Sequence, residues 1–188
     1  MPRKTGSPAL SNLITQDYIE QLQKTHGEDR YWGGTGYKYA EKILSLAKQY
    51  KCFDALDYGS SHHRNCLKQH FHRHYPGELL IYEYDPGVPS KSALPDPADI
   101  LICTDVLEHV EPELLDNVLR HMESCMLLCG FMVISTVPAK TILDDGRNAH
   151  LIVEDKDWWI EKVGTVFNVF KAGWNNSTVH IFVAKGEM

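Results

Sequence analysis

Short apolar runs alternate with longer amphipathic stretches through most of the chain after residue 51. Apolar runs that end in turn residues are typical of strands, and apolar residues repeated every three or four positions are typical of helices. The apolar runs predict strands at 52–59, 78–85, 100–104 and 130–136, and a C-terminal hairpin at 166–172 and 179–184. The helical spacing predicts helices at 64–74, 112–127 and 155–163. Strands that alternate with helices specify a mostly parallel sheet covered on both faces, so we expect an α/β fold closed by an antiparallel hairpin.

The residues before this pattern hold two further apolar stretches with helical spacing. We expect helices at 11–25 and 37–50, joined by a glycine-rich loop at 26–36. The chain is 188 residues long, which fits one compact domain rather than two. The predicted organisation is one domain over 1–188, with the helices and the loop in 1–50 and the core in 51–188.

Composition and charge narrow the class of protein. The chain is 43% hydrophobic and has a net charge of −6, and no run approaches the roughly 20 apolar residues that cross a bilayer. The N-terminus lacks the apolar core of a signal peptide, so we expect a cytoplasmic protein that binds no membrane. The negative charge disfavours non-specific binding to phosphate backbones, and the sequence carries no strong nucleic-acid signal. Five cysteines without a C-x-x-C pair predict reduced core thiols.

Polar residues follow directly after the first two predicted strands. Asp57 and Gly59 end the first strand, and Asp85 ends the second about 28 residues later. In parallel sheets, ligands bind beyond the carboxyl ends of the strands, where a glycine turn lets backbone N–H groups approach and a second acid accepts hydrogen bonds from ribose hydroxyls. This spacing indicates a nucleoside-binding site, although a strand that only happens to end in Asp-x-Gly gives the same pattern.

Several segments of the chain carry a resemblance to a known family. They are Leu56–Gly59, Glu83–Pro86, the block Ala98–Val110 with its Asp-Val-Leu-Glu-His-Val run, and the terminal hairpin. Together they resemble the class I S-adenosylmethionine-dependent methyltransferases, especially the small stand-alone bacterial and phage members, over roughly residues 30–184. The resemblance implies a Rossmann-like three-layer sandwich with a six- to seven-stranded sheet, and S-adenosylmethionine as the cofactor.

The resemblance also implies roles for individual residues toward the cofactor. It places Gly59 and Ser61 near the methionine part, Asp85 on the ribose, and Leu94 and Asp105 near the adenine and the methyl-transfer end. Asp57, at the end of the first strand, completes this expected cofactor-binding set.

The sequence departs from the family pattern in two places. The family usually has further glycines after Asp-x-Gly, whereas this chain has Ser60, Ser61, His62 and His63. Any position there that needs a positive φ is strained without glycine, so one hypothesis is a reshaped cofactor loop and the other is a methyltransferase-like binding protein without turnover. In addition, only about 14 residues separate Asp85 from Asp99, too few for a helix and another full strand. We therefore expect a trimmed sheet edge.

The candidate catalytic groups follow the third predicted strand and the fourth. Asp105, Glu108 and His109 would share one face of a helical turn, and His150 lies in the loop after the fourth strand. We expect Asp105, His109 and His150 around the reacting centre, with a histidine acting as a base. Similar D-x-x-E-H blocks bind a divalent metal in some quinone-biosynthesis and small-RNA methyltransferases, where a later histidine completes the site. Glu108 and His109 are thus candidate metal ligands, and a structural role for these residues stays open.

The acceptor is constrained mainly by absent motifs. The sequence has neither an N/D-P-P-Y/F tetrapeptide nor a Pro-Cys pair, and these motifs mark methyltransferases that act on nucleic-acid bases. We therefore expect methylation of an oxygen or nitrogen on a small-molecule or nucleotide-like acceptor. The sequence does not indicate an oligomeric state.

Overall fold

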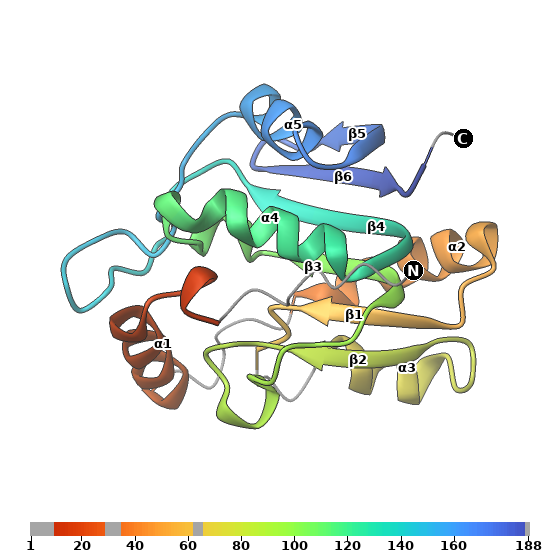
Figure 1. Cartoon of the computed structure of the whole chain (residues 1–188), viewed down its shortest axis with the longest axis horizontal. Coiled ribbons are helices and arrows are strands. Elements are labelled where there is room, and N and C mark those ends of the chain that lie inside the picture. The colour runs from red at the N-terminus through yellow and green to blue at the C-terminus, as the bar shows by residue number, and fades with distance from the viewer. Residues whose placement is uncertain (1–9, 29–34, 62–65, 187–188) are drawn as a thin grey trace, which may run out of the picture.

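The computed structural model describes residues 10–28, 35–61 and 66–186 (Figure 1). Its centre is a six-stranded sheet with the order β2-β1-β3-β4-β6-β5. The strands are β1 (Asp54–Tyr58), β2 (Leu80–Tyr84), β3 (Ala98–Thr104), β4 (Met126–Ser135), β5 (Asn168–Trp174) and β6 (Thr178–Ala184). The pairs β1–β2, β1–β3 and β3–β4 are parallel, whereas β6 runs antiparallel to both β4 and β5. The predicted α/β fold with a C-terminal antiparallel hairpin is confirmed.

Helices cover both faces of this sheet. They are α1 (Gln16–Glu28), α2 (Ala40–Tyr50), α3 (Leu67–His74), α4 (Leu115–Ser124) and α5 (Lys156–Gly164). Short 3-10 helices lie at Leu10–Asn12, Gly36–Tyr39, Pro89–Lys91, Leu107–His109 and Pro112–Leu114. In Figure 1, α4 and α5 lie on one face, α2 and α3 lie behind the sheet, and α1 stands beyond the ends of the strands.

The core consists of two apolar layers, one on each side of the sheet. Alternate residues of a strand point to opposite faces. Leu56 and Leu101 therefore pack toward α4 and α5, while Ile100 and Ile102 pack toward α2 and α3. Both layers are closed to solvent at the centre of the sheet, as expected for parallel strands covered by helices on both sides.

The connection between β2 and β3 is short. Between Tyr84 and Ala98 the chain forms only the 3-10 helix Pro89–Lys91 and then runs back along the sheet to the start of β3 (Figure 1). No strand lies outside β2 among the described residues, which confirms the predicted trimmed edge.

Several predicted boundaries were wrong by a few residues. The helix predicted at 112–127 ends at Ser124, because β4 already begins at Met126. The first helix begins at Gln16 rather than at residue 11, and a 3-10 helix precedes α2. These errors occur where an apolar residue suits either element, so that periodicity does not locate the boundary.

All five cysteines are buried, as predicted. Among the described residues, no helix has the length and apolar character needed to cross a membrane.

Candidate functional site

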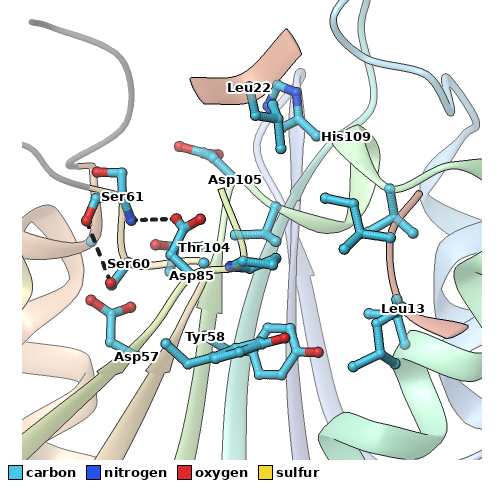
Figure 2. Close-up of a pocket in the computed structure, with 18 of the residues that line it drawn as sticks. Leu13, Leu22, Asp57, Tyr58, Ser60, Ser61, Asp85, Thr104, Asp105 and His109 are labelled. Carbon is cyan, nitrogen blue, oxygen red and sulfur yellow. Dashed lines mark hydrogen bonds between the residues drawn. The ribbon is translucent and has the colours of Figure 1, made fainter. Parts of the chain in front are cut away.

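A pocket lies at the carboxyl ends of β1, β2 and β3 (Figure 2). Its polar side includes Asp57, Ser61, Asp85 and Asp105, and its apolar side includes the N-terminal residues Leu13, Ile14 and Leu22. The carboxyl ends of parallel strands meet at one edge of the sheet, which is where ligands bind in such folds. The structure therefore brings together the strand-end residues that the sequence predicted as a site.

The turn after β1 forms the floor of the polar side. The backbone N–H groups of Gly59 and Ser60 donate to the Tyr84 carbonyl at 2.8 and 3.1 Å, which joins the turn to the end of β2. Gly59 has a φ of 81°, and a Cβ at this position would lie 2.4 Å from a methyl carbon of Val106. Only glycine fits there without a change in the surroundings.

Ser61 also adopts a left-handed backbone conformation, with a φ of 50°. For a residue with a Cβ this conformation costs about 1–2 kcal/mol. The Ser61 N–H donates to Asp85 Oδ2 at 2.8 Å (Figure 2). The structure thus retains a tight turn at this position without glycine. His62 and His63 lie outside the described residues.

Two buried acids, Asp57 and Asp85, lie on the polar side of the pocket. Burial, with a smaller contribution from the nearby Glu83 carboxylate, raises the pKa of Asp57 to about 7. Asp85 accepts backbone hydrogen bonds from Ser61 through Oδ2 and from Gly87 through Oδ1, at 2.8 and 2.9 Å. Because each carboxylate oxygen has two lone pairs, Asp85 can accept further hydrogen bonds from a ligand.

The block after β3 does not form the predicted helical turn. The chain turns at Asp105, which has a φ of 56°, and a 3-10 helix begins only at Leu107. Asp105 and His109 line the pocket, and the Asp105 carboxylate accepts a hydrogen bond from the Thr35 hydroxyl. The prediction that Asp105, Glu108 and His109 share one face was therefore wrong for Glu108. Its side chain is buried and does not line the pocket.

Glu108 is completely buried. Its Oε1 accepts the Ser135 N–H at 2.8 Å, while its Oε2 has no hydrogen-bond partner among the described residues. Burial raises the pKa of Glu108 to about 8, and the Asp105 carboxylate contributes to this increase. A buried acceptor without a partner is costly, so Oε2 is an orphaned polar atom next to the site.

His109 and His150 lie against each other, with ring centroids 4.8 Å apart and an edge-on angle of 83°. His109 Nδ1 is 2.7 Å from the Ala149 carbonyl oxygen, and His150 Nδ1 is 2.6 Å from that of Val137. A carbonyl oxygen only accepts, so in each neutral ring Nδ1 carries the proton and Nε2 carries the lone pair. Of the two rings, only His109 is part of the pocket lining.

The loop that carries His150 is held by Asn148. The Asn148 side chain bonds the N–H and the carbonyl of Ala139, each at 2.9 Å, and its Oδ1 also accepts the His150 N–H at 2.9 Å. One potential ligand atom each from Glu108, His109 and His150 lies within 4.8 Å of the others. The predicted grouping of the later histidine with this block is thus present in the fold.

Sequence reasoning missed the contribution of the N-terminal helix to the site. The Tyr18 hydroxyl donates to the His109 carbonyl at 2.8 Å, and Glu111 accepts from the N–H and the hydroxyl of Thr15 at 2.8 and 2.7 Å. These contacts hold α1 over the pocket. The apolar spacing predicted the helix, but such spacing does not show which surface a helix covers.

One predicted site residue lies elsewhere. Leu94 is 38% exposed and does not line the pocket. It lies in the irregular segment between the 3-10 helix Pro89–Lys91 and β3, so the structure does not bring it to the pocket with the other predicted residues.

The fold is that of the class I S-adenosylmethionine-dependent methyltransferases. A 1,6-didemethyltoxoflavin-N1-methyltransferase from Burkholderia thailandensis, solved with bound 1,6-didemethyltoxoflavin and S-adenosylhomocysteine, matches with a TM-score of 0.60 at 11% identity over 91% of this chain and 90% of that chain. The DhpI complex with S-adenosylhomocysteine matches with a TM-score of 0.54 at 13% identity, over 90% and 98% of the two chains.

A third solved structure is the magnesium protoporphyrin IX methyltransferase of Synechocystis with bound S-adenosylhomocysteine. It matches with a TM-score of 0.50 at 14% identity, over 90% of this chain and 97% of that chain. No protein-family model matches the sequence, and a search of curated proteins gives no match. Similarity at such low identity establishes the fold, whereas the chemistry must be argued from the site.

Proposed function

We propose that this chain is an S-adenosylmethionine-dependent methyltransferase that acts on an oxygen or nitrogen of a small-molecule or nucleotide-like acceptor. One observation carries the proposal: a pocket with a glycine turn and two buried acids lies at the carboxyl ends of β1 and β2 in a class I methyltransferase fold. We further propose a cytoplasmic location, which the five buried cysteines favour because exported proteins tend to pair theirs.

The chemistry of the pocket fits the proposed cofactor. S-adenosylmethionine carries a sulfonium and an ammonium group, and Asp57, Asp85 and Asp105 supply carboxyl groups on one side of the pocket. Leu13 and Leu22 supply an apolar wall for the less polar parts of the ligand. We assign Asp85 to the ribose hydroxyls and the turn at Gly59 and Ser61 to the methionine part, and we assign Asp105 to the methyl-transfer end.

The bound cofactor would supply a methyl group already activated by the positive charge on sulfur, so the protein's tasks are positioning and proton removal. We assign proton removal to His109, because it lines the pocket and its Nε2 carries the lone pair when the ring is neutral. A base at this position takes the proton of an acceptor hydroxyl or amine while the methyl group is transferred. The edge-on ring of His150 supports the orientation of His109.

We also propose Glu108, His109 and His150 as candidate ligands of a divalent cation. Glu108 Oε2, which has no hydrogen-bond partner among the described residues, would be one ligand atom, and the rings of His109 and His150 would supply one nitrogen each. Metal–ligand distances for such donors are about 2.0–2.2 Å, so atoms up to 4.8 Å apart must move closer together to bind one ion. A cation held there would lower the pKa of an acceptor hydroxyl.

The first experiment is a calorimetric titration of the purified chain with S-adenosylhomocysteine. We expect saturable binding that Asp85→Asn weakens and that Asp96→Asn, a change at an exposed aspartate, leaves unaltered. Absence of binding at high micromolar ligand would refute the proposed function. Binding without methyl transfer to any acceptor would favour the alternative, a methyltransferase-like binding protein without turnover.

A second experiment assigns the acceptor and the base. Mass spectrometry of copurifying small molecules would identify acceptor candidates for the methyl-transfer assay. His109→Gln is then expected to lower kcat about 100-fold or more, as for loss of a general base, while binding of S-adenosylhomocysteine is retained. Elemental analysis of the wild type and of His109→Ala decides the metal assignment, because metal content below stoichiometry and unchanged by the substitution would remove it.

A further inference from the structure

A lysine outside the predicted site contacts Ser60 and Ser61 in the turn that follows β1. Lys91, at the end of the 3-10 helix Pro89–Lys91, donates through Nζ to Glu83 Oε1 at 2.8 Å and to Ser60 Oγ at 3.4 Å, and it also donates to the Ser61 carbonyl. The three contacts match the three N–H donors of an ammonium group. The Lys91 and Glu83 side chains are only 18% and 14% exposed, so this ion pair is largely shielded from water.

The backbone of Lys91 is fixed to the same strand end. Its carbonyl accepts the Asp85 N–H at 3.1 Å, and its own N–H donates to the Val88 carbonyl at 2.8 Å. The segment that follows β2 is therefore folded back so that Lys91 reaches the turn that follows β1. Glu83 also pairs with Lys68 at 3.4 Å, but that lysine is 52% exposed.

The contacts converge on the residue that takes the left-handed conformation without glycine. Asp85 accepts the Ser61 N–H, and Lys91 donates to the Ser61 carbonyl. Both peptide groups of Ser61 are thus held by side chains from the β2 end. A strained backbone conformation persists only where the surroundings stabilise it, and here the partly buried Lys91 ammonium and the buried Asp85 carboxylate do so.

We propose that Lys91 is a positioning residue for the cofactor. It holds the Ser60–Ser61 turn in the conformation that binds the methionine part of S-adenosylmethionine, and Glu83 orients the lysine. The inference rests on the proposed function and extends it, because it names the side chain that supports the turn at the position where the family pattern has glycines. Lys91 acts through the turn and does not itself contact the reacting atoms.

The test compares two ligands by calorimetry: S-adenosylhomocysteine, and 5′-methylthioadenosine, which lacks the amino-acid part. We expect Lys91→Met to weaken binding of S-adenosylhomocysteine roughly tenfold to a hundredfold, as for loss of hydrogen bonds from a charged donor. Binding of 5′-methylthioadenosine should change by less than about threefold. Lys91→Arg should restore most of the affinity, since guanidinium also donates to several acceptors.

Two further variants act as controls. Lys68→Met removes the exposed partner of the same Glu83 carboxylate, and it should leave both affinities within about twofold of the wild type. Glu83→Gln keeps a hydrogen-bond acceptor for Lys91 but removes the negative charge. It should therefore weaken binding of S-adenosylhomocysteine, by less than Lys91→Met does, and leave binding of 5′-methylthioadenosine unchanged. This variant carries the test if Lys91→Met does not fold.

Three outcomes would overturn the proposal. If Lys91→Met binds S-adenosylhomocysteine as tightly as the wild type, the lysine does not position the turn. If Lys91→Met weakens the binding of both ligands equally, the lysine only stabilises the fold. If the wild type binds no S-adenosylhomocysteine, the proposed function itself fails and the role of Lys91 fails with it, a result distinguishable from the first two.

Discussion

The substitution Gly59→Ala gives a direct measure of how tightly the turn after β1 is packed. A Cβ added there would lie 2.4 and 2.8 Å from the two methyl carbons of Val106, and Gly59 has a φ of 81°. Ordinary carbon–carbon contacts begin at about 3.5 Å. The variant therefore combines an unfavourable backbone conformation with a severe overlap.

The two costs can be estimated separately. A left-handed conformation costs a residue with a Cβ about 1–2 kcal/mol, and forcing an extra carbon into a packed region costs about 1–3 kcal/mol. Gly59→Ala should thus lower the free energy of unfolding by about 2–5 kcal/mol. Small domains have only about 5–15 kcal/mol in total, so the effect is large enough to measure by urea denaturation.

Gly77 offers a matched control. Its φ is 78°, almost the same as that of Gly59, but nothing lies within 4 Å of an added Cβ. Gly77→Ala should lower the free energy of unfolding only by the cost of the left-handed backbone conformation, about 1–2 kcal/mol. The difference between the two variants then measures the overlap with Val106 alone.

Shortening Val106 separates the overlap in a second way. In a double-mutant cycle with Val106→Ala, we expect a favourable coupling of about 1–3 kcal/mol, because the smaller side chain lacks the two methyl carbons that make the closest contacts. The reasoning is refuted if Gly59→Ala loses no more stability than Gly77→Ala, or if the cycle shows no coupling.

Two further predictions follow from buried and capping carboxylates. Burial and the Glu83 carboxylate raise the pKa of Asp57 to about 7, so the folded state binds this proton more tightly than the unfolded chain does. The free energy of unfolding should therefore decrease by up to about 4 kcal/mol as the pH rises from about 4 to about 7. Urea titrations at several pH values should show a weaker pH dependence for Asp57→Asn than for the wild type. Asp155 accepts two backbone N–H groups at the start of α5, both at 2.9 Å, so Asp155→Ala should cost about 1 kcal/mol, whereas Glu154→Ala, outside the cap, should be nearly neutral in the same assay.

Local pattern was sufficient to predict the sheet. Buried parallel strands are short apolar runs, and polar residues directly after them lie at the carboxyl edge of the sheet, which is why spacing alone could place Asp57 and Asp85 together at the pocket. The missing strand could also be predicted, because chain length between Asp85 and Asp99 limits what can be built there.

Contacts between residues far apart in sequence could not be predicted. The spacing in the block after β3 suggested a shared helical face, but Asp105 turns in a left-handed conformation and directs Glu108 into the interior. Likewise, the helical pattern near Tyr18 does not encode its hydrogen bond to the backbone of His109, 91 residues away. In both cases tertiary packing decides the outcome, and a single sequence carries no periodic signal for it.

The two departures from the family pattern are physically connected in this fold. Without a further helix and strand, the chain after β2 has only about a dozen residues in which to reach β3, and its first turn packs directly against the strand end. This arrangement brings Lys91 within hydrogen-bonding distance of Ser60 and Ser61. A turn made of glycines needs no such support, because glycine adopts positive φ without strain. If Lys91 holds this turn as we propose, the shortened connection supplies the supporting side chain, and lengthening the connection by an inserted helix should weaken binding of S-adenosylhomocysteine even though the insertion lies outside the pocket.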